Sequence, residues 1–131
     1  ADAGMSEILF VGHIGKLIKV AGGVKNTHSK YGDRRMEIMA DCLPDTLDEQ
    51  VRNEWTDRIF GCNTTEEALE YLKSWGICDQ VMHTAVSRMQ HYMKQWAGGN
   101  CDVQVVTFST VYGILGKTSD SDRMIERWRQ S

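Results

Sequence analysis

The chain has 131 residues and a mass of 14.9 kDa, which suits one domain and excludes a large multidomain enzyme. Hydrophobic residues make up 41% and charged residues 25%, which is ordinary globular usage and excludes a disordered or collagen-like chain. The net charge of −3 gives no drive toward non-specific nucleic-acid binding, and no apolar run approaches the ~20 residues of a membrane span. We therefore expect no nucleic-acid or membrane partner. With no secretory signal visible, we expect a cytoplasmic protein.

The first element predicted is a strand over Ser6–His13, with the sequence SEILFVGH. A continuous apolar run without polar alternation indicates a strand that is buried on both faces, as in a parallel sheet. Gly15 then opens a helical pattern, which Gly22-Gly23 interrupts. The order of strand, glycine turn and helix is typical of an α/β fold.

Three amphipathic helices are predicted in the middle of the chain. The first begins after Pro44-Asp45, and the second begins at a capping box formed by Thr64 and Glu67. The third ends at Gly98-Gly99 and carries a stripe that we interpret as core packing rather than a cofactor site: Met82, Ala85, Met89, Tyr92, Met93 and Trp96.

A second buried strand is predicted over residues 102–110, followed by a short helix that runs through Trp128. Because helical crossovers join parallel strands, the chain is predicted to be α/β, with layered helices around a small, mainly parallel sheet. Two strands make a poor sheet, so we expect further strands from outside this chain. Residues 1–131 are then a single α/β domain, a fragment of a larger two-domain protein.

A basic segment follows the first strand. Six Lys or Arg and one acid lie between positions 12 and 35, inside a protein of negative net charge. Ligands of open α/β sheets bind beyond the carboxyl ends of the strands, where Gly12, His13 and Gly15 lie. Lys16 and Lys19 share one face of the following helix, which favours an anionic small molecule. The alternative is a tight turn followed by a solvated basic face.

A run of hydrogen-bonding side chains comes next: Asn26, Thr27, His28 and Ser29. Such side chains are costly to bury without partners, so we expect them either to meet a ligand or to cap a helix. His28 is the candidate that could move a proton near neutral pH. The segment ends with three alternating charged residues, of which Arg35 offers a planar fork for a carboxylate: Asp33, Arg35 and Glu37.

Other candidates favour a structural interpretation. His83 and His91 lie eight residues apart, too far for the i, i+4 pair of a metal site, and we expect no protein metal site. The four cysteines have no metal or disulfide spacing and are expected to be free, partly buried thiols: Cys42, Cys62, Cys78 and Cys101. The glycines at 113 and 116 follow the second strand, where either a ligand loop or a polar strand exit is expected.

The basic segment resembles the cobalt-precorrin-5B methyltransferases of the anaerobic cobalamin pathway. The resemblance is carried by Val11-Gly12-His13-Ile14-Gly15-Lys16-Leu17, Lys19, Ala21, Gly23, Asn26-Thr27-His28-Ser29, Asp33, Arg35 and Glu37. It extends more loosely over the whole chain and corresponds to the C-terminal portion of longer family members. Gly32 and Lys25 depart from the pattern, where an Ala and an apolar residue are expected.

The resemblance implies a methyltransferase that transfers a methyl group from S-adenosylmethionine to ring carbon C-1 of a cobalt-bearing tetrapyrrole. Cobalt is carried by the substrate, and the small-molecule tetrapyrrole is the expected partner, with a homo-oligomer left open. The carboxylate rim of the substrate suits charge-assisted hydrogen bonds from Lys16, Lys19 and Arg35, and His28 is the expected catalytic residue. The other expected substrate-binding residues are Gly12, His13, Gly15, Asn26, Thr27, Ser29, Asp33 and Glu37.

Two further interpretations stay open. The chain could be a non-catalytic anion- or tetrapyrrole-binding domain of a corrinoid-pathway protein, with catalysis elsewhere in a longer chain. It could also be an assembly domain whose basic segment docks on an acidic partner. Small-molecule affinity separates these interpretations, because an assembly domain should show none.

Overall fold

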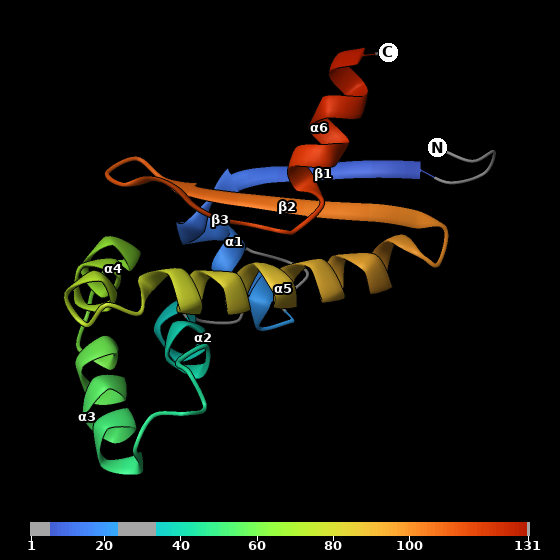
Figure 1. The fold of residues 1–131 in the computed structure, drawn as a ribbon. Helices are drawn as coiled ribbons and strands as arrows, with labels where there is room; N and C mark the ends of the chain where they lie inside the picture. The colour runs from blue at the N-terminus through green and yellow to red at the C-terminus, as the bar shows by residue number, and fades with distance from the viewer. Residues whose placement is uncertain (1–5, 24–33, 131) are drawn as a thin grey trace.

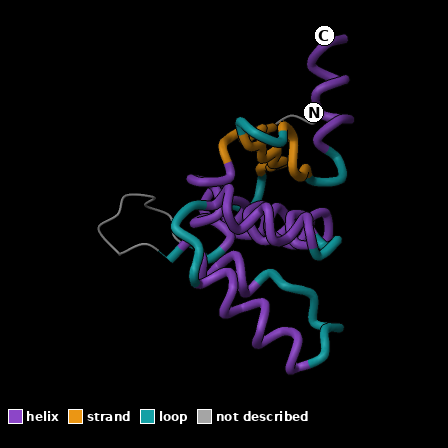
Figure 2. The backbone as a smooth tube through the Cα atoms, turned by 90° about the vertical axis from the view of Figure 1, so that its left-hand side faces the viewer, coloured by secondary structure: helices purple, strands orange, loops and turns teal. Residues whose placement is uncertain are grey.

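A computed structural model describes residues 6–23 and 34–130. The described elements are, in chain order, β1 (Ser6–His13), α1 (Ile14–Ala21), α2 (Arg35–Asp41), α3 (Glu49–Phe60), α4 (Thr65–Ser74), α5 (Cys78–Ala97), β2 (Cys101–Ser109), β3 (Gly113–Lys117) and α6 (Ser121–Gln130). Figure 1 shows α5 running along one face of the sheet while α6 rises from the other. The side view in Figure 2 shows the sheet between these helices. The predicted α/β class, with layered helices around a small sheet, is confirmed.

The sheet has the order β1-β2-β3. β1 and β2 are parallel, with Ser6 opposite Cys101 and His13 opposite Phe108. The helical crossover between them explains this direction, as the sequence predicted. β3 is antiparallel to β2 and was not predicted, because it is short and contains two glycines, which are depleted in strands. The third strand therefore comes from this chain itself, where we expected a loop.

The prediction that β1 is buried on both faces is wrong. Phe10 is 38% exposed and Val11 is 58% exposed. β1 is an edge strand that pairs with β2 alone, so its open side is not covered by another described strand. β2 lies in the middle of the sheet, and its Val103 and Val105 are fully buried.

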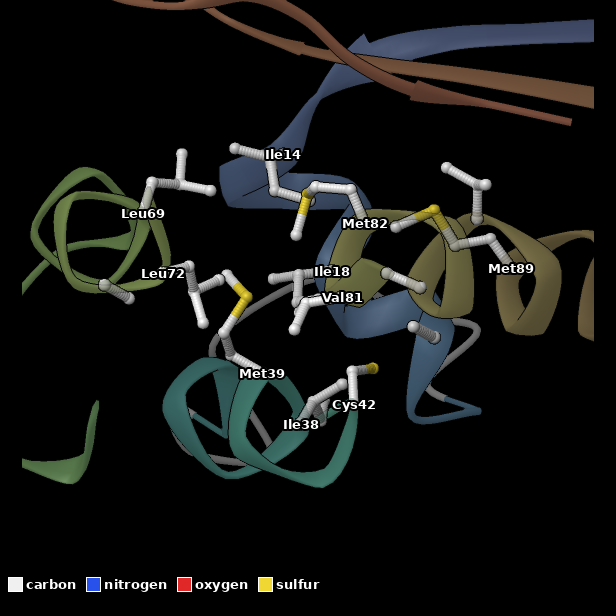
Figure 3. Close-up of a cluster of buried hydrophobic side chains, with 14 of the residues drawn as sticks. Ile14, Ile18, Ile38, Met39, Cys42, Leu69, Leu72, Val81, Met82 and Met89 are labelled. Atoms are coloured by element: carbon white, nitrogen blue, oxygen red, sulfur yellow. The ribbon is translucent and has the colours of Figure 1, made fainter. Parts of the chain in front are cut away.

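The core lies between the sheet and the helices α1, α2, α4 and α5. Figure 3 shows side chains from these helices converging there, and five that are fully buried are Ile14, Ile18, Met39, Leu72 and Met82. Met82, Ala85, Met89 and Met93 of α5 are all buried. These four residues are core packing, as predicted. Burying each methionine contributes about 1.5–3 kcal/mol. Tyr92 and Trp96 of the same predicted stripe are only half-buried against the core, and Tyr92 also lines a cleft.

The helix ends follow local capping rules. Thr64 caps α4 by accepting a hydrogen bond from the Glu67 amide at 3.2 Å, as the capping box predicted. α5 ends before Gly98, whose φ of +90° suits glycine. α3 begins at Glu49, later than predicted, because Asp48 is its cap and accepts from the Gln50 amide at 3.2 Å.

Candidate functional site

The carboxyl end of β1 runs directly into α1, and His13 is the residue where the two meet. Its Nδ1 accepts a hydrogen bond from the Gly15 amide at 2.9 Å, so His13 is the N-cap of α1. A ring whose Nδ1 accepts carries its proton on Nε2 when neutral. That Nε2 lies 3.3 Å from Glu66 Oε1 on α4. His13 therefore links the strand end, the first turn of α1 and α4.

Further contacts surround this junction. The other carboxylate oxygen of Glu66 accepts from the Thr65 hydroxyl at 2.9 Å. The His13 ring meets Phe108 of β2 edge-on, with 5.8 Å between centroids. The Thr107 hydroxyl donates to the Gly12 carbonyl at 3.1 Å. The polar groups at the two strand ends are thus occupied in joining β1, α1, α4 and β2.

The two glycines of this turn have packing reasons within the chain. A Cβ on Gly12 would lie 3.0 Å from side-chain carbons of Leu17, and one on Gly15 would lie 3.1 Å from His13 Nδ1. Both contacts are tighter than a side chain normally tolerates. Close approach of a ligand is therefore not needed to explain them. The ligand role expected for Gly12, His13 and Gly15 stays a prediction.

The predicted charged residues of α1 and α2 do not all lie at this junction. Lys16 is exposed on α1, and Lys19 on the same helix is half-buried. Arg35 begins α2 and donates from Nη1 to the Gly15 carbonyl at 3.5 Å, which ties α2 to α1. Glu37 on α2 belongs to a different place, a cleft farther along α1.

This cleft has a volume of about 770 Å³ and lies between the end of α1, the helix α2 and the long helix α5. Ala21, Gly22 and Ile38 supply its apolar lining. Six polar or charged residues of α2 and α5 line it further: Arg34, Glu37, Asp41, Thr84, Ser87 and Arg88. A concave site of this size with a few converging polar groups is typical of small-molecule binding.

The charges of the cleft are arranged as two ion pairs. Arg34 Nε lies 3.0 Å from Glu37 Oε2, and Arg88 Nη1 lies 2.6 Å from Asp41 Oδ2. The side chains of the first pair are 53% and 59% exposed, and those of the second 38% and 72%. Ion pairs this exposed are worth little, so an anionic ligand can take the place of the carboxylate beside either guanidinium.

A buried thiol lies behind the second pair. Burial raises the pKa of Cys42 to about 11, while the Arg88 charge opposes that rise and Asp41 adds to it. Arg88 Nη1 lies 3.9 Å from Cys42 Sγ. Burial by itself lowers the pKa of Arg88. Cys42 and the Asp41 carboxylate raise this pKa by more, so it lies above its usual value. The guanidinium therefore stays charged.

Three further cleft residues on α5 were missed by sequence reasoning: His83, His91 and Tyr92. Both histidines were expected to be ordinary surface or satisfied residues. A signal was present, because His83, Ser87 and His91 follow at i, i+4 and i+8 along one row of a helix. The adjacent row carries a hydroxyl, a guanidinium and a phenol at positions 84, 88 and 92. Sequence alone could not show that this face borders α2.

Five predicted site residues lie outside the described residues: Asn26, Thr27, His28, Ser29 and Asp33. Their expected roles, including that of His28 as a base, stay predictions. Within residues 6–23 and 34–130, no group of three or more His, Cys, Asp or Glu side chains could hold a metal ion. No helix in these same ranges is long and apolar enough to cross a membrane.

Comparison with known proteins gives consistent matches. A family model described as "CbiD, C-terminal domain" matches residues 26–119. A Fusobacterium nucleatum protein named cobalt-precorrin-5B C(1)-methyltransferase is 36% identical over 121 residues, covering 91% of this chain and 30% of that protein. Proteins of the same name from Listeria monocytogenes serotype 4a and Clostridioides difficile are each 36% identical, with 94% of this chain covered and 33% and 30% of those proteins. The chain thus spans about a third of these relatives, and no solved structure matches it significantly.

Proposed function

Because this chain belongs to the CbiD family through its C-terminal domain, we propose that it takes part in methylating cobalt-precorrin-5B at ring carbon C-1. This is the reaction in the names of its relatives, which are about three times as long. The methylation belongs to anaerobic cobalamin biosynthesis and uses S-adenosylmethionine as methyl donor. The role of this domain is to hold the tetrapyrrole.

The observation that carries this role is the cleft between α2 and α5. Its volume of about 770 Å³ lies in the upper part of the range found for small-molecule sites. Arg34, which caps the start of α2, and Arg88 of α5 line the cleft from two sides, each beside an exposed carboxylate. A substrate with a rim of carboxylates can displace Glu37 and Asp41 and form charge-assisted hydrogen bonds to both guanidinium groups. Substrate positioning supplies much of the rate in an in-line methyl transfer.

We propose that the methyl donor binds away from the strand end where the sequence first placed a ligand. S-adenosylmethionine supplies a methyl group from a sulfonium, which leaves as a neutral thioether. At the end of β1, the Gly15 amide is occupied by His13 Nδ1 and the space beside Gly12 is filled by Leu17. These contacts support a donor site in the part of the longer enzymes that this chain does not cover.

Several expectations remain part of the proposal. Lys16 and Lys19 lie on α1, whose last residue borders the cleft, and they are proposed to attract the anionic substrate. His28 remains the proposed base, with Asn26, Thr27, Ser29 and Asp33 beside it in sequence. A cytoplasmic location and a homo-oligomer stay predictions.

Binding of cobyrinic acid, a fully carboxylated cobalt corrin, tests the substrate role. We expect saturable binding that weakens with salt and falls by ~10-fold or more in Arg88→Ala, because one charge-assisted contact is lost. Lys73→Ala is a matched control, since this exposed lysine lies on α4 outside the cleft. Absence of binding by the wild-type protein would overturn the role and favour an assembly domain.

A chimera tests the reaction itself. This chain replaces the matching third of the Listeria relative, and methylation of cobalt-precorrin-5B is measured with and without the Arg88→Ala change. We expect activity in the chimera and a raised KM in the variant, because the lost contact holds the substrate. A chimera that binds corrin tightly but transfers no methyl group would favour a non-catalytic tetrapyrrole-binding domain.

A further inference from the structure

His83 is a residue of the cleft to which the proposed function gives no role. It is exposed on α5 and lines the cleft. Within the described part of the chain, its imidazole makes no hydrogen bond, ion pair or ring contact. His91, two turns farther along the same row, instead packs edge-on against Tyr92 with 5.4 Å between centroids. The two histidines therefore differ, because the His91 ring packs against Tyr92 while the exposed His83 ring can meet a ligand in the cleft.

The composition of the cleft limits what this imidazole can bind. The described residues offer no group of three donors for a metal ion, so a bare cation has no complete site here. A metal already held by the ring nitrogens of a macrocycle needs only axial ligands, as a haem iron needs one histidine. Imidazole is a common ligand for late first-row transition metals. A single accessible histidine therefore suffices for a metallated tetrapyrrole.

The neighbours of His83 fit the remainder of such a ligand. Ser87 follows His83 at i+4 on the same face of α5. Arg88 lies about 7.5 Å from His83 along the helix axis, because the helix rises 1.5 Å per residue. The ion pair of Arg34 borders the cleft from the start of α2. A macrocycle whose metal meets His83 therefore has cations beside it to pair with peripheral carboxylates.

We propose that His83 is an axial ligand of the cobalt ion in the tetrapyrrole substrate. This assignment rests on the proposed function, because it needs a cobalt-bearing ring in the cleft. A cobalt–nitrogen bond forms from the lone pair of the neutral imidazole, and a water bound to cobalt leaves. The oxidation state of cobalt does not change. The bond fixes the height and orientation of the ring in the cleft, so His83 is a substrate-binding residue.

Two probes separate this inference from the proposed function: cobyrinic acid and its metal-free counterpart, hydrogenobyrinic acid. The wild-type protein, His83→Ala and the matched control His91→Ala are titrated with both. We expect His83→Ala to bind the cobalt ring at least ~10-fold more weakly, with the metal-free ring unaffected. His91 also lines the cleft, so any loss of affinity in His91→Ala should be the same for both rings, because this ring packs on Tyr92 and is not assigned to the metal. Because the His83 side chain is exposed, its removal should leave the unfolding midpoint unchanged.

Electron paramagnetic resonance of the cobalt(II) form gives a direct readout. The wild type and His91→Ala should show superhyperfine splitting from one axial nitrogen, and His83→Ala should lack it. Retention of the splitting in His83→Ala, or its absence in the wild-type complex, would overturn the assignment while leaving the substrate role intact. Failure of the wild type to bind either ring would overturn the assignment and the substrate role together.

Discussion

The junction at His13 gives a prediction that separates a structural from a ligand-binding role. In His13→Ala, α1 loses the acceptor for the Gly15 amide at 2.9 Å and the contact with Glu66 at 3.3 Å. A helix cap is worth about 1 kcal/mol, and a polar contact as exposed as this one, at 33% and 30%, adds no more than about 1 kcal/mol. We expect His13→Ala to lower the free energy of unfolding by about 1–2 kcal/mol, with lost ring packing on Phe108 included.

His13→Asn is the decisive companion variant. Its side-chain oxygen can still accept from the Gly15 amide, since Asn is a good N-cap, but it loses the contact with Glu66. Urea unfolding should therefore show that Asn recovers about 1 kcal/mol relative to Ala. Equal destabilisation by Asn and Ala would refute the capping role. A stable His13→Asn protein that no longer binds cobyrinic acid would show instead that His13 is a ligand residue.

Three further predictions concern other parts of the fold. Gly22→Ala should lower the free energy of unfolding by about 1 kcal/mol or more in urea, because its new Cβ would lie 2.5 Å from Cδ1 of the buried Ile38. Thr118→Val should lower the free energy of unfolding by about 1–3 kcal/mol in the same assay. The buried Thr118 hydroxyl accepts a hydrogen bond from the Val105 amide at 2.9 Å and donates one to Gln104 Oε1, and valine can form neither. Cys42 should react with iodoacetamide at pH 8.5 more slowly than the half-buried Cys101, because its raised pKa of about 11 leaves little thiolate.

Each of these predictions has a control and a result that would contradict it. Gly99→Ala has open space around its new Cβ and should be nearly neutral, so equal effects at Gly22 and Gly99 would contradict the clash. Thr118→Ser keeps the hydroxyl and should recover most of the loss seen in Thr118→Val. Peptide mass spectrometry follows the alkylation, and labelling of Cys42 as fast as Cys101 would contradict its burial.

The elements of this protein follow largely from local sequence signals. The apolar run of β1 predicts its bounds, Ser6–His13, and glycines mark the ends of α1 and α5. The Thr64 cap marks the start of α4. These features depend on residues within one or two helical turns, so they can be predicted from the sequence alone. The parallel pairing of β1 and β2 follows as well, because the intervening helices require it.

The candidate site was predictable only in part. Sequence reasoning chose the basic segment and included Glu37, which borders the cleft, but it dismissed His83 and did not consider Arg88. Arg88 reaches Asp41 across 47 positions of sequence, and no local pattern encodes that encounter. His13 was chosen as a ligand because it lies at the carboxyl end of the first strand, where ligands of open α/β sheets bind. Its capping role depends on how the strand enters the helix.

By itself, the sequence determined the order of the helices and strands other than α2 and β3, the Thr64 cap, the buried methionines of α5 and the family, since each depends on neighbouring residues. Tertiary structure alone decided that β1 is an exposed edge and that the glycine-rich segment 113–117 is a strand, because both depend on which segments pair. It also decided that α2 and α5 border a cleft. Packing brings their charged faces together, and a side chain's surroundings depend on residues far away in the chain.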